Sequence, residues 1–336
     1  MGRITITSTL TLSFFLIILV YSASANNSIP KGLSYNFYNK TCPQLEDIVR
    51  ATLAPVFTND PTSAAALLRL MFHDCQVQGC DASILIDVSN SASLEPPELG
   101  AKKNFGIRKR ESINQIKSRI EEECPGLVSC ADIIVLAARE AVAISGGPRI
   151  IVPLGRRDSI SASSSEDADA SLPAPDFGVD DALSLFAKLG MTTRETVAIM
   201  GSHTLGVTHC LNIMDRLYRP SDVRGSNMDP RFEALLKFSC PENIPFSQNI
   251  SFVLNDPSTF IFDNLYYKNS LQRRGVLRID AELPLNTRTA GIVEQFAANS
   301  DDFFQEFGSA FLKLSYAGVL TGNHGIIRSM CNFVDN

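Results

Sequence analysis

The sequence predicts an all-α protein whose core forms one domain or two closely packed halves. Apolar residues recur at helical spacing through most of the 336 residues. Strand signals are few and short, the best being "RIIVPL" at 149–154. There is no internal repeat and no long linker. The most polar stretches, 87–104 and the serine-rich 157–182, are therefore expected to be surface loops of one compact body.

The expected helices follow from apolar spacing and from residues that start and stop helices. "CADIIVLAAREAVAISGGP" is a buried helix that stops at Gly146, and "DDALSLFAKLG" begins on aspartates and stops at Gly190. Thr192 and Glu195 form a capping box that opens "TTRETVAIMGSHT". The helical segments, in order, are 45–56, 67–73, 113–120, 130–145, 180–189, 192–203 and 303–314.

The amino-terminal segment indicates export. Residues 1–25 combine an early arginine, a short apolar stretch and small residues, which is the layout of a cleaved signal peptide, leaving 26–336 as the mature domain. The alternative is an uncleaved anchor, but the apolar stretch is short for a membrane span.

A net charge of −6 without a basic block argues against a nucleic-acid partner. Glycosylation sequons occur at Asn26, Asn39 and Asn249.

The eight cysteines all follow the presumed signal peptide. An even number in an exported chain predicts four disulfides, although eight cysteines allow 105 pairings and spacing alone does not choose among them. The competing interpretation is a metal cluster. Cys75 and Cys80 lie too far from the others in sequence to suggest a zinc ribbon.

An arginine and a histidine interrupt the apolar run "LLRLMFHDCQVQGCD". On a helix Arg69, Phe72 and His73 stand at i, i+3 and i+4 and share one face, while Leu67, Leu70 and Met71 share another. One face can then pack into the core while the other presents a cation and a base to a pocket. The alternative from spacing alone is a core histidine with an arginine held in a structural ion pair.

The other three histidines give weaker signals by themselves. His203 ends an apolar helix in "GSHTLG", where a structural role is the default interpretation for a lone histidine. His209, beside a cysteine, and His324, in "TGNHG", are expected to have surface or loop roles.

The ordered motifs resemble those of the secreted plant peroxidases, the class III haem peroxidases. "RLMFHDCQVQGCDASILID" is similar to their distal haem motif and "VAIMGSHTLGVTHC" to their proximal haem motif. "LSYNFYNKTCP", "VSCADIIVLAARE", "GGPRIIVPLGRRDS", "LPAP", "FDNLYY" and "AGVLTG" follow in the family's order. The resemblance covers nearly all of the mature chain and implies the haem peroxidase fold, with one haem b between a distal and a proximal helical half.

The resemblance also implies catalytic roles. His203 would be the axial ligand of the haem iron. His73 would move a proton between the two oxygens of hydrogen peroxide, and Arg69 would stabilise the separating charge. Phe72 would form a wall of the distal pocket, and Pro173 of "LPAP" would edge the channel for aromatic donors.

Partners for the two histidines are implied in the same way. Asp280 would hold His203 and increase its donor strength. Asn104 in "KKNFGIR" would keep His73 basic, with Glu98 six residues earlier near a calcium ion. This loop differs from the family's usual sequence and is about one residue shorter.

Two calcium ions are implied, because calcium takes several hard oxygen ligands from carboxylates, hydroxyls and carbonyls. The distal set consists of Asp74, the carbonyls of Val77 and Gly79, Asp81 and Ser83.

The proximal calcium set would be Thr204, Asp256, Ser258 and Asp263. Counting back from Asp263 places Asn255 and Ser258 at the ligand positions, with Asp256 and Thr259 each one residue away. Either the loop shifts by one residue or the site has lost a carboxylate.

The family pattern implies the disulfides Cys42–Cys124, Cys75–Cys80, Cys130–Cys331 and Cys210–Cys240. It also makes Asp132 and Arg156 a buried structural ion pair.

The expected activity is the reduction of hydrogen peroxide with one-electron oxidation of small phenolic donors. The enzyme is expected to be a monomer in the extracellular space or cell wall, without a membrane partner. The rival hypothesis is a secreted haem- or calcium-binding scaffold that has lost efficient turnover, suggested by the altered loops at Asn104 and Asp256. A zinc hydrolase is disfavoured because the chain has no HExxH-type spacing.

Overall fold

The computed structural model describes residues 28–87, 97–219, 228–243 and 251–334. The predicted signal peptide and the sequons at Asn26 and Asn249 lie outside these residues, whereas Asn39 lies on an exposed turn. In the described part of the chain, no helix is both long and apolar enough to cross a membrane.

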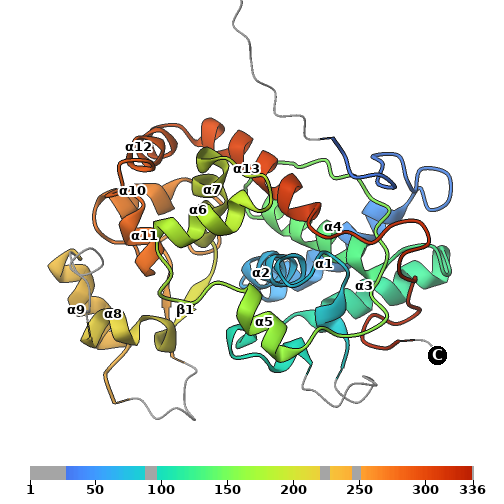
Figure 1. Ribbon diagram of the computed structural model, residues 1–336, viewed down its shortest axis with the longest axis horizontal. Coiled ribbons are helices and arrows are strands. Elements are labelled where there is room, and N and C mark those ends of the chain that lie inside the picture. The colour runs from blue at the N-terminus through green and yellow to red at the C-terminus, as the bar shows by residue number, and fades with distance from the viewer. Residues whose placement is uncertain (1–27, 88–96, 220–227, 244–250, 335–336) are drawn as a thin grey trace, which may run out of the picture.

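The described residues are mostly helical, which confirms the predicted fold class (Figure 1). The first group of α-helices comprises α1 Leu45–Asn59, α2 Ser63–Gln76, α3 Arg110–Glu123, α4 Cys130–Ile144 and α5 Ser165–Ser171. The second comprises α6 Val179–Ala187, α7 Thr193–Met200, α8 Met214–Tyr218, α9 Pro230–Ser239, α10 Leu265–Leu271, α11 Arg278–Glu282, α12 Ala290–Ala298 and α13 Ser300–Ser315. Short 3-10 turns are η1 Ser83–Leu85, η3 Glu98–Gly100, η4 Lys102–Asn104, η5 Gly201–Thr204 and η6 Cys210–Ile213.

The two groups of helices form two halves that share one hydrophobic core. In the first half α2 packs along α4, while α1 packs against both α3 and α4. In the second half α13 packs on α7 and α10 packs on α12. Helix α13 also contacts α2, so it joins the halves (Figure 1). Several large, fully buried side chains of the second half are phenylalanines on or near α12 and α13: Phe262, Phe296, Phe303, Phe307 and Phe311.

Local sequence explains where the central helices begin and end. Ser129 precedes α4 and its hydroxyl accepts a hydrogen bond from the Asp132 amide at 3.1 Å. Helix α4 is followed by Gly146, whose φ of +96° suits a glycine just beyond a helix end. The predicted capping box is confirmed: the Thr192 amide donates to Glu195 at 2.7 Å, and the Glu195 amide donates to Thr192 at 3.1 Å.

The strand predicted at 149–154 is wrong. Only Leu154 pairs, through an isolated bridge to Ser34. Pro148 and Pro153 flank most of this segment and cannot donate to a strand partner, which limits it to an extended strand-like connection. The described residues instead contain an antiparallel pair of three-residue strands, β1 Val207–His209 and β2 Phe252–Leu254.

The stretch 157–182, predicted to be a surface loop, contains helix α5. Ser164 caps this helix by accepting a hydrogen bond from the Asp167 amide at 3.0 Å, so the serine-rich sequence includes a true helix start. Of the other predicted loop, 97–104 forms η3 and η4, and 88–96 lies outside the described residues.

Four disulfides are present with the pairing that the resemblance implied: Cys42–Cys124, Cys75–Cys80, Cys130–Cys331 and Cys210–Cys240. Cys130–Cys331 attaches the carboxyl-terminal segment to the start of α4, and Figure 1 shows that segment returning to the side of α3. Asp132 and Arg156 form the expected ion pair at 2.9 Å, with both side chains fully buried. Tyr38 and the Gly155 amide also donate to Asp132, so the buried carboxylate is well satisfied.

Candidate active site

Helix α2 brings Arg69 and His73 into direct contact. Arg69 Nε donates to His73 Nε2 at 3.1 Å, so Nε2 carries the lone pair and the ring proton is on Nδ1. His73 Nδ1 then donates to Asn104 Oδ1 at 2.6 Å, while Asn104 Nδ2 donates to the Glu98 carbonyl at 2.5 Å. This chain of donors fixes both the histidine tautomer and the direction of the amide. His73 is a neutral imidazole whose Nε2 can accept a proton.

The protonation states of this pair suit a base beside a cation. Burial, and then the charge of Arg69, lowers the pKa of His73 to about 3. Burial lowers the pKa of Arg69 to about 10, so the guanidinium keeps its charge at neutral pH. Arg69 forms no ion pair with a carboxylate among the described residues; its Nη1 and Nη2 donate to the carbonyls of Phe105 and Lys103 at 3.1 and 3.2 Å. An enclosed cation without a carboxylate is well suited to an anionic ligand.

Helix α5 holds the turn that contains Asn104. Asp169 accepts hydrogen bonds from the Lys102 and Lys103 amides at 3.3 and 2.9 Å. Lys103 Nζ donates back to the carbonyls of Asp169 and Leu172, both at 2.5 Å. Sequence reasoning missed this contact, because nothing in "KKNFGIR" identifies its partner about 66 residues away.

Phe72 lies beside His73, with the two rings edge to face at 5.5 Å between centroids. It also meets the ring of Phe186 of α6, at 6.2 Å between centroids, and packs against a small buried cluster that includes Leu172. Pro173 follows Leu172 and is partly exposed. The segment after α5 therefore lies near the side of α2 that carries Phe72.

His209 is closer to this region than a surface role implies. Its ring meets Phe105 edge to face at 5.3 Å, and its buried Nδ1 has no hydrogen-bond partner in the described part of the chain. Burial, and then the charges of Arg69 and Arg108, lowers its pKa. His324 is exposed, as expected for a loop residue.

In the second half of the fold, His203 lies in η5, directly after α7. Its Nδ1 donates to Asp280 Oδ1 at 2.9 Å, and Asp280 is only 3% exposed. Nε2 has no hydrogen bond to any described residue and is therefore the nitrogen that can bind a metal. The His203 side chain is 27% exposed, so the ring is not enclosed on all sides by described residues.

A buried tyrosine shares the carboxylate that holds His203. Tyr266 Oη donates to the same Asp280 Oδ1 at 2.8 Å, and the Leu277 amide donates to Oδ2 at 2.9 Å. Tyr266 belongs to the "FDNLYY" motif, and nothing in that motif connects it to His203.

The predicted distal calcium residues converge in the loop after α2. Asp74, Glu98 and Ser83 are almost fully buried, Asp81 is 8% exposed, and Val77 and Gly79 lie in the same buried loop. Ser83 Oγ donates to Glu98 Oε2 at 3.0 Å, while Asp74 Oδ1 and Glu98 Oε1 have no hydrogen-bond partner among the described residues.

Without a cation, the charged forms of these carboxyl groups are disfavoured. Burial, followed by Asp81 and Glu98, raises the pKa of Asp74 well above its ordinary value, and burial raises the pKa of Glu98 to about 7. Within the described ranges no three His, Cys, Asp or Glu side chains form a metal cluster by themselves. The predicted set depends equally on hydroxyl and carbonyl oxygens, and the unpartnered carboxylate atoms fit calcium.

The proximal loop brings Asp256, from the shifted count, together with Ser258, from the unshifted count, while Thr259 Oγ1 donates to the Asp256 carbonyl at 2.7 Å. Thr204 Oγ1 donates to Asp256 at 2.7 Å and lies 3.3 Å from Asp263, while Ser258 Oγ lies 3.0 and 3.1 Å from the same two carboxylates. Asn255 turns away to accept a hydrogen bond from Thr208 at 2.7 Å. Burial, and then Asp263, raises the pKa of Asp256 to about 6. The four oxygen-bearing side chains therefore fit a calcium ion without loss of a carboxylate.

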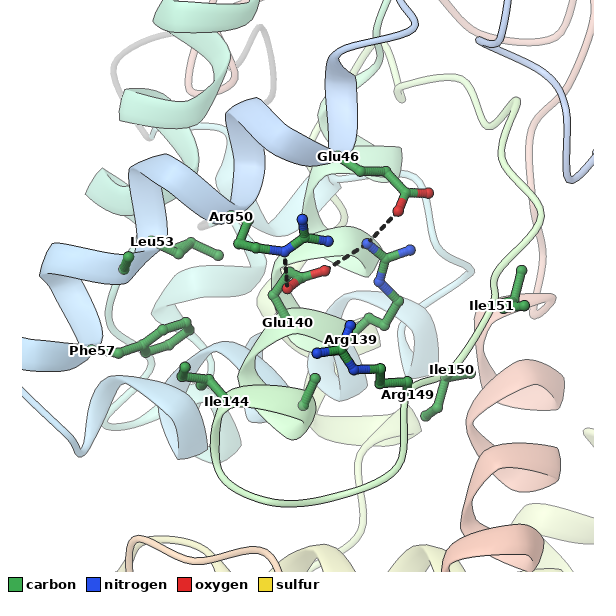
Figure 2. A pocket seen from close by; sticks show the side chains of 12 residues that line it. Glu46, Arg50, Leu53, Phe57, Arg139, Glu140, Ile144, Arg149, Ile150 and Ile151 are labelled. Atoms are coloured by element: carbon green, nitrogen blue, oxygen red, sulfur yellow. Dashed lines mark hydrogen bonds and ion pairs between the residues drawn. The ribbon is translucent and has the colours of Figure 1, made fainter.

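A separate pocket of about 280 Å³ lies between α1, the end of α4 and residues 149–151 (Figure 2). Arg139 contacts Glu46 at 3.1 Å and Glu140 at 2.7 Å, and Arg50 contacts Glu140 at 3.5 Å. None of the candidate catalytic residues lines it. Its charges largely pair with one another, so it is not part of the site around His73.

Comparison with known proteins agrees with this arrangement. The sequence model of the family described as Peroxidase matches residues 49–299. The chain belongs to the peroxidase family. The peroxidase is 55% identical to Peroxidase 29 of Arabidopsis thaliana over 307 residues, covering 91% of this chain and 90% of the relative.

Other plant peroxidases match over similar lengths. Peroxidase 12 of Arabidopsis thaliana is 39% identical over 325 residues, covering 96% of this chain and 88% of the relative. Cationic peroxidase SPC4 of Sorghum bicolor is 39% identical over 304 residues, covering 90% and 82%. The protein is therefore a haem peroxidase, an enzyme that uses hydrogen peroxide as oxidant, and its family uses haem and calcium.

Proposed function

We propose that His203 would hold the iron of one haem b through Nε2, and that His73, Arg69 and Asn104 would act together on hydrogen peroxide. The observation that carries this proposal is the donor chain from Arg69 to His73 to Asn104, which leaves a neutral imidazole beside an enclosed cation. Haem, when bound, supplies the iron that takes up peroxide and exchanges electrons with it and with the donor.

His73, Arg69 and Asn104 have different roles in breaking the O–O bond of hydrogen peroxide. His73 Nε2 accepts the proton from one peroxide oxygen and returns it to the other, which leaves as water. Arg69 stabilises the negative charge that develops during this separation. Asn104 holds the proton on Nδ1 and so keeps Nε2 available as the base. Two one-electron oxidations of donor then complete the turnover and release a second water.

The proximal residues hold the ligand. Asp280 accepts the Nδ1 proton of His203, which orients the ring and increases the electron density on Nε2. Two calcium ions would stabilise the loops on either side: one held by Asp74, Val77, Gly79, Asp81 and Ser83 with Glu98 nearby, and one held by Thr204, Asp256, Ser258 and Asp263.

The donors are proposed to be small phenols that reach the haem edge near Pro173, because Phe72 and its neighbours restrict the distal pocket. We also propose a secreted monomer, in the extracellular space or cell wall. The support is the signal-peptide pattern of residues 1–25 and the four disulfides, which persist in oxidising compartments.

The scaffold alternative rested on the altered loops at Asn104 and Asp256. Asn104 contacts His73, and Asp256 contacts Thr204, so neither loop gives a reason to expect lost turnover.

The test is stopped-flow absorbance of the haem-loaded enzyme mixed with hydrogen peroxide. His73→Ala should slow the change in haem absorbance by about 10²–10⁴-fold, the usual contribution of a general base. His324→Ala, at an exposed loop histidine, is the matched control and should react at the wild-type rate. Equal rates for wild type and His73→Ala would refute the catalytic proposal and favour the scaffold.

A further inference from the structure

The hydroxyl of Tyr266 competes with His203 for one oxygen atom. Both groups donate to Asp280 Oδ1, Tyr266 at 2.8 Å and His203 at 2.9 Å. A carboxylate oxygen that accepts two hydrogen bonds has less negative charge to offer each donor than one that accepts a single bond. The His203–Asp280 bond is therefore weaker than it would be if Tyr266 did not donate.

The surroundings hold this arrangement in place. Tyr266 is 3% exposed, and its ring meets the ring of His203 edge to face at 6.1 Å and that of Tyr267 at 4.9 Å. Asp280 is held independently by the Leu277 amide, which donates to Oδ2 at 2.9 Å at the start of α11. Burial, and then Asp280, raises the pKa of Tyr266 well above its ordinary value, so the hydroxyl remains a neutral donor.

We propose that Tyr266 is a positioning residue that limits the electron donation of His203 to the haem iron by sharing the oxygen of Asp280. This inference rests on the proposed role of His203 as axial ligand. A carboxylate that pulls the Nδ1 proton strongly makes the imidazole a better donor and stabilises ferric over ferrous iron. Tyr266 opposes that effect and so raises the ferric–ferrous reduction potential.

The sign of the effect separates this role from simple orientation. If Tyr266 only oriented Asp280, its removal would loosen the carboxylate, weaken the bond to His203 and raise the potential. Because the Leu277 amide already orients Asp280, removal of the hydroxyl should strengthen the bond to His203 and lower the potential.

The experiment compares Tyr266→Phe with Tyr267→Phe in the haem-loaded enzyme. Both substitutions delete one buried hydroxyl and keep the ring. Tyr267 donates to the Val197 carbonyl at 3.0 Å and makes no hydrogen bond to Asp280 among the described residues. Equal losses of thermal stability would show that the two variants carry similar structural costs.

Two properties other than activity, the reduction potential and the iron–histidine stretching frequency, are expected to change in Tyr266→Phe but not in Tyr267→Phe. Spectroelectrochemistry should show a lower ferric–ferrous reduction potential than in the wild type. The ferric form should be favoured on the order of tenfold, which for a one-electron couple is a decrease of about 59 mV. Resonance Raman spectra of the ferrous enzyme should show the iron–histidine stretch at higher frequency. An unchanged or raised potential, or the same shift in Tyr267→Phe, would overturn the inference.

The axial assignment is tested separately in His203→Gly. The iron–histidine band should disappear in that variant. If the band persists, the proposed function is wrong about His203, whatever Tyr266→Phe does. If it disappears and Tyr266→Phe leaves the band and the potential unchanged, only the inference about Tyr266 fails.

Discussion

Replacing Asp256 with asparagine should have opposite effects on stability with and without calcium. The side chain lies 2.7 Å from Thr204 Oγ1 and 3.0 Å from Ser258 Oγ, and both hydroxyls also lie near Asp263. With calcium bound, two carboxylates contribute to affinity. Without calcium, the same two carboxylates, one buried (Asp256) and one partly exposed (Asp263), lie close together and repel each other.

The magnitudes follow from these two states. If loss of one carboxylate weakens calcium binding about tenfold to a hundredfold, Asp256→Asn loses about 1.4–2.7 kcal/mol of stability in saturating calcium. In calcium-free protein, the pKa of about 6 for Asp256, against its ordinary 3.8, corresponds to a penalty of at most about 3 kcal/mol at neutral pH. The penalty is absent below about pH 3.8 and complete above about pH 6, because only the folded state retains the proton between these values. Asparagine removes this penalty.

Thermal unfolding at neutral pH, in millimolar calcium and in excess chelator, would check the prediction. Asp256→Asn should unfold below the wild type with calcium and at or above it without calcium. Asn255→Ala is the control: it loses the hydrogen bonds to Thr208 and to the Leu205 carbonyl, and its cost should not depend on calcium. If Asn255→Ala abolishes the calcium response and Asp256→Asn retains it, the assignment of Asp256 to the calcium site is wrong.

The remaining predictions concern the distal side. His73 has a pKa of about 3, so its free base is present above that pH. The rate constant for reaction of the enzyme with hydrogen peroxide should therefore stay level from about pH 7 to about pH 4 and fall at lower pH. A stopped-flow profile in which this rate constant falls around pH 6.5 would contradict the prediction. Asn104→Ala removes the acceptor for the Nδ1 proton and should lower the same rate constant at least about tenfold, whereas a change of less than about twofold would argue against its role. Asp169→Ala releases the amides of the turn at Lys103, so amide hydrogen exchange should increase across 102–106 and the peroxide rate should fall several-fold, with the rate of phenol oxidation unchanged. Unaltered exchange across 102–106 would show that α5 does not hold the turn.

Helices were predictable because their information is local. Arg69 and His73 had to share a face once 67–73 formed a helix. In the structure Arg69 Nε lies 3.1 Å from His73 Nε2. The capping box at Thr192 was equally local, since both partners lie within one turn. The strand predicted at 149–154 failed because strand formation depends on a neighbour, and in the structure only Leu154 finds one.

The calcium loops show a second limit of sequence reading. Counting back from Asp263 assumed that the loop keeps the family's register and placed Asn255 in the site. In the structure Asp256 lies beside Thr204, whereas Asn255 bonds to Thr208 of β1 and to the Leu205 carbonyl, so the contacts favour Asp256 for the proposed calcium site. A loop can shift by one residue when a nearby strand offers a better partner for a side chain, and such a partner is invisible in the sequence.

The two histidines of the candidate site differ chiefly in the atom that accepts their Nδ1 proton. His73 donates to the neutral amide of Asn104, 31 residues away, and remains an uncharged base beside a cation. His203 donates to the carboxylate of Asp280, 77 residues away, which makes its other nitrogen a stronger ligand. Exchanging the partners would give a distal base with too much affinity for its proton and a proximal ligand with too little donor strength. From the sequence, only the resemblance could suggest Asn104 and Asp280 as these partners, and it assigned no role to Tyr266. Because Tyr266 adds a second donor to Asp280, the electron density at His203 depends on a three-residue network that no single motif contains.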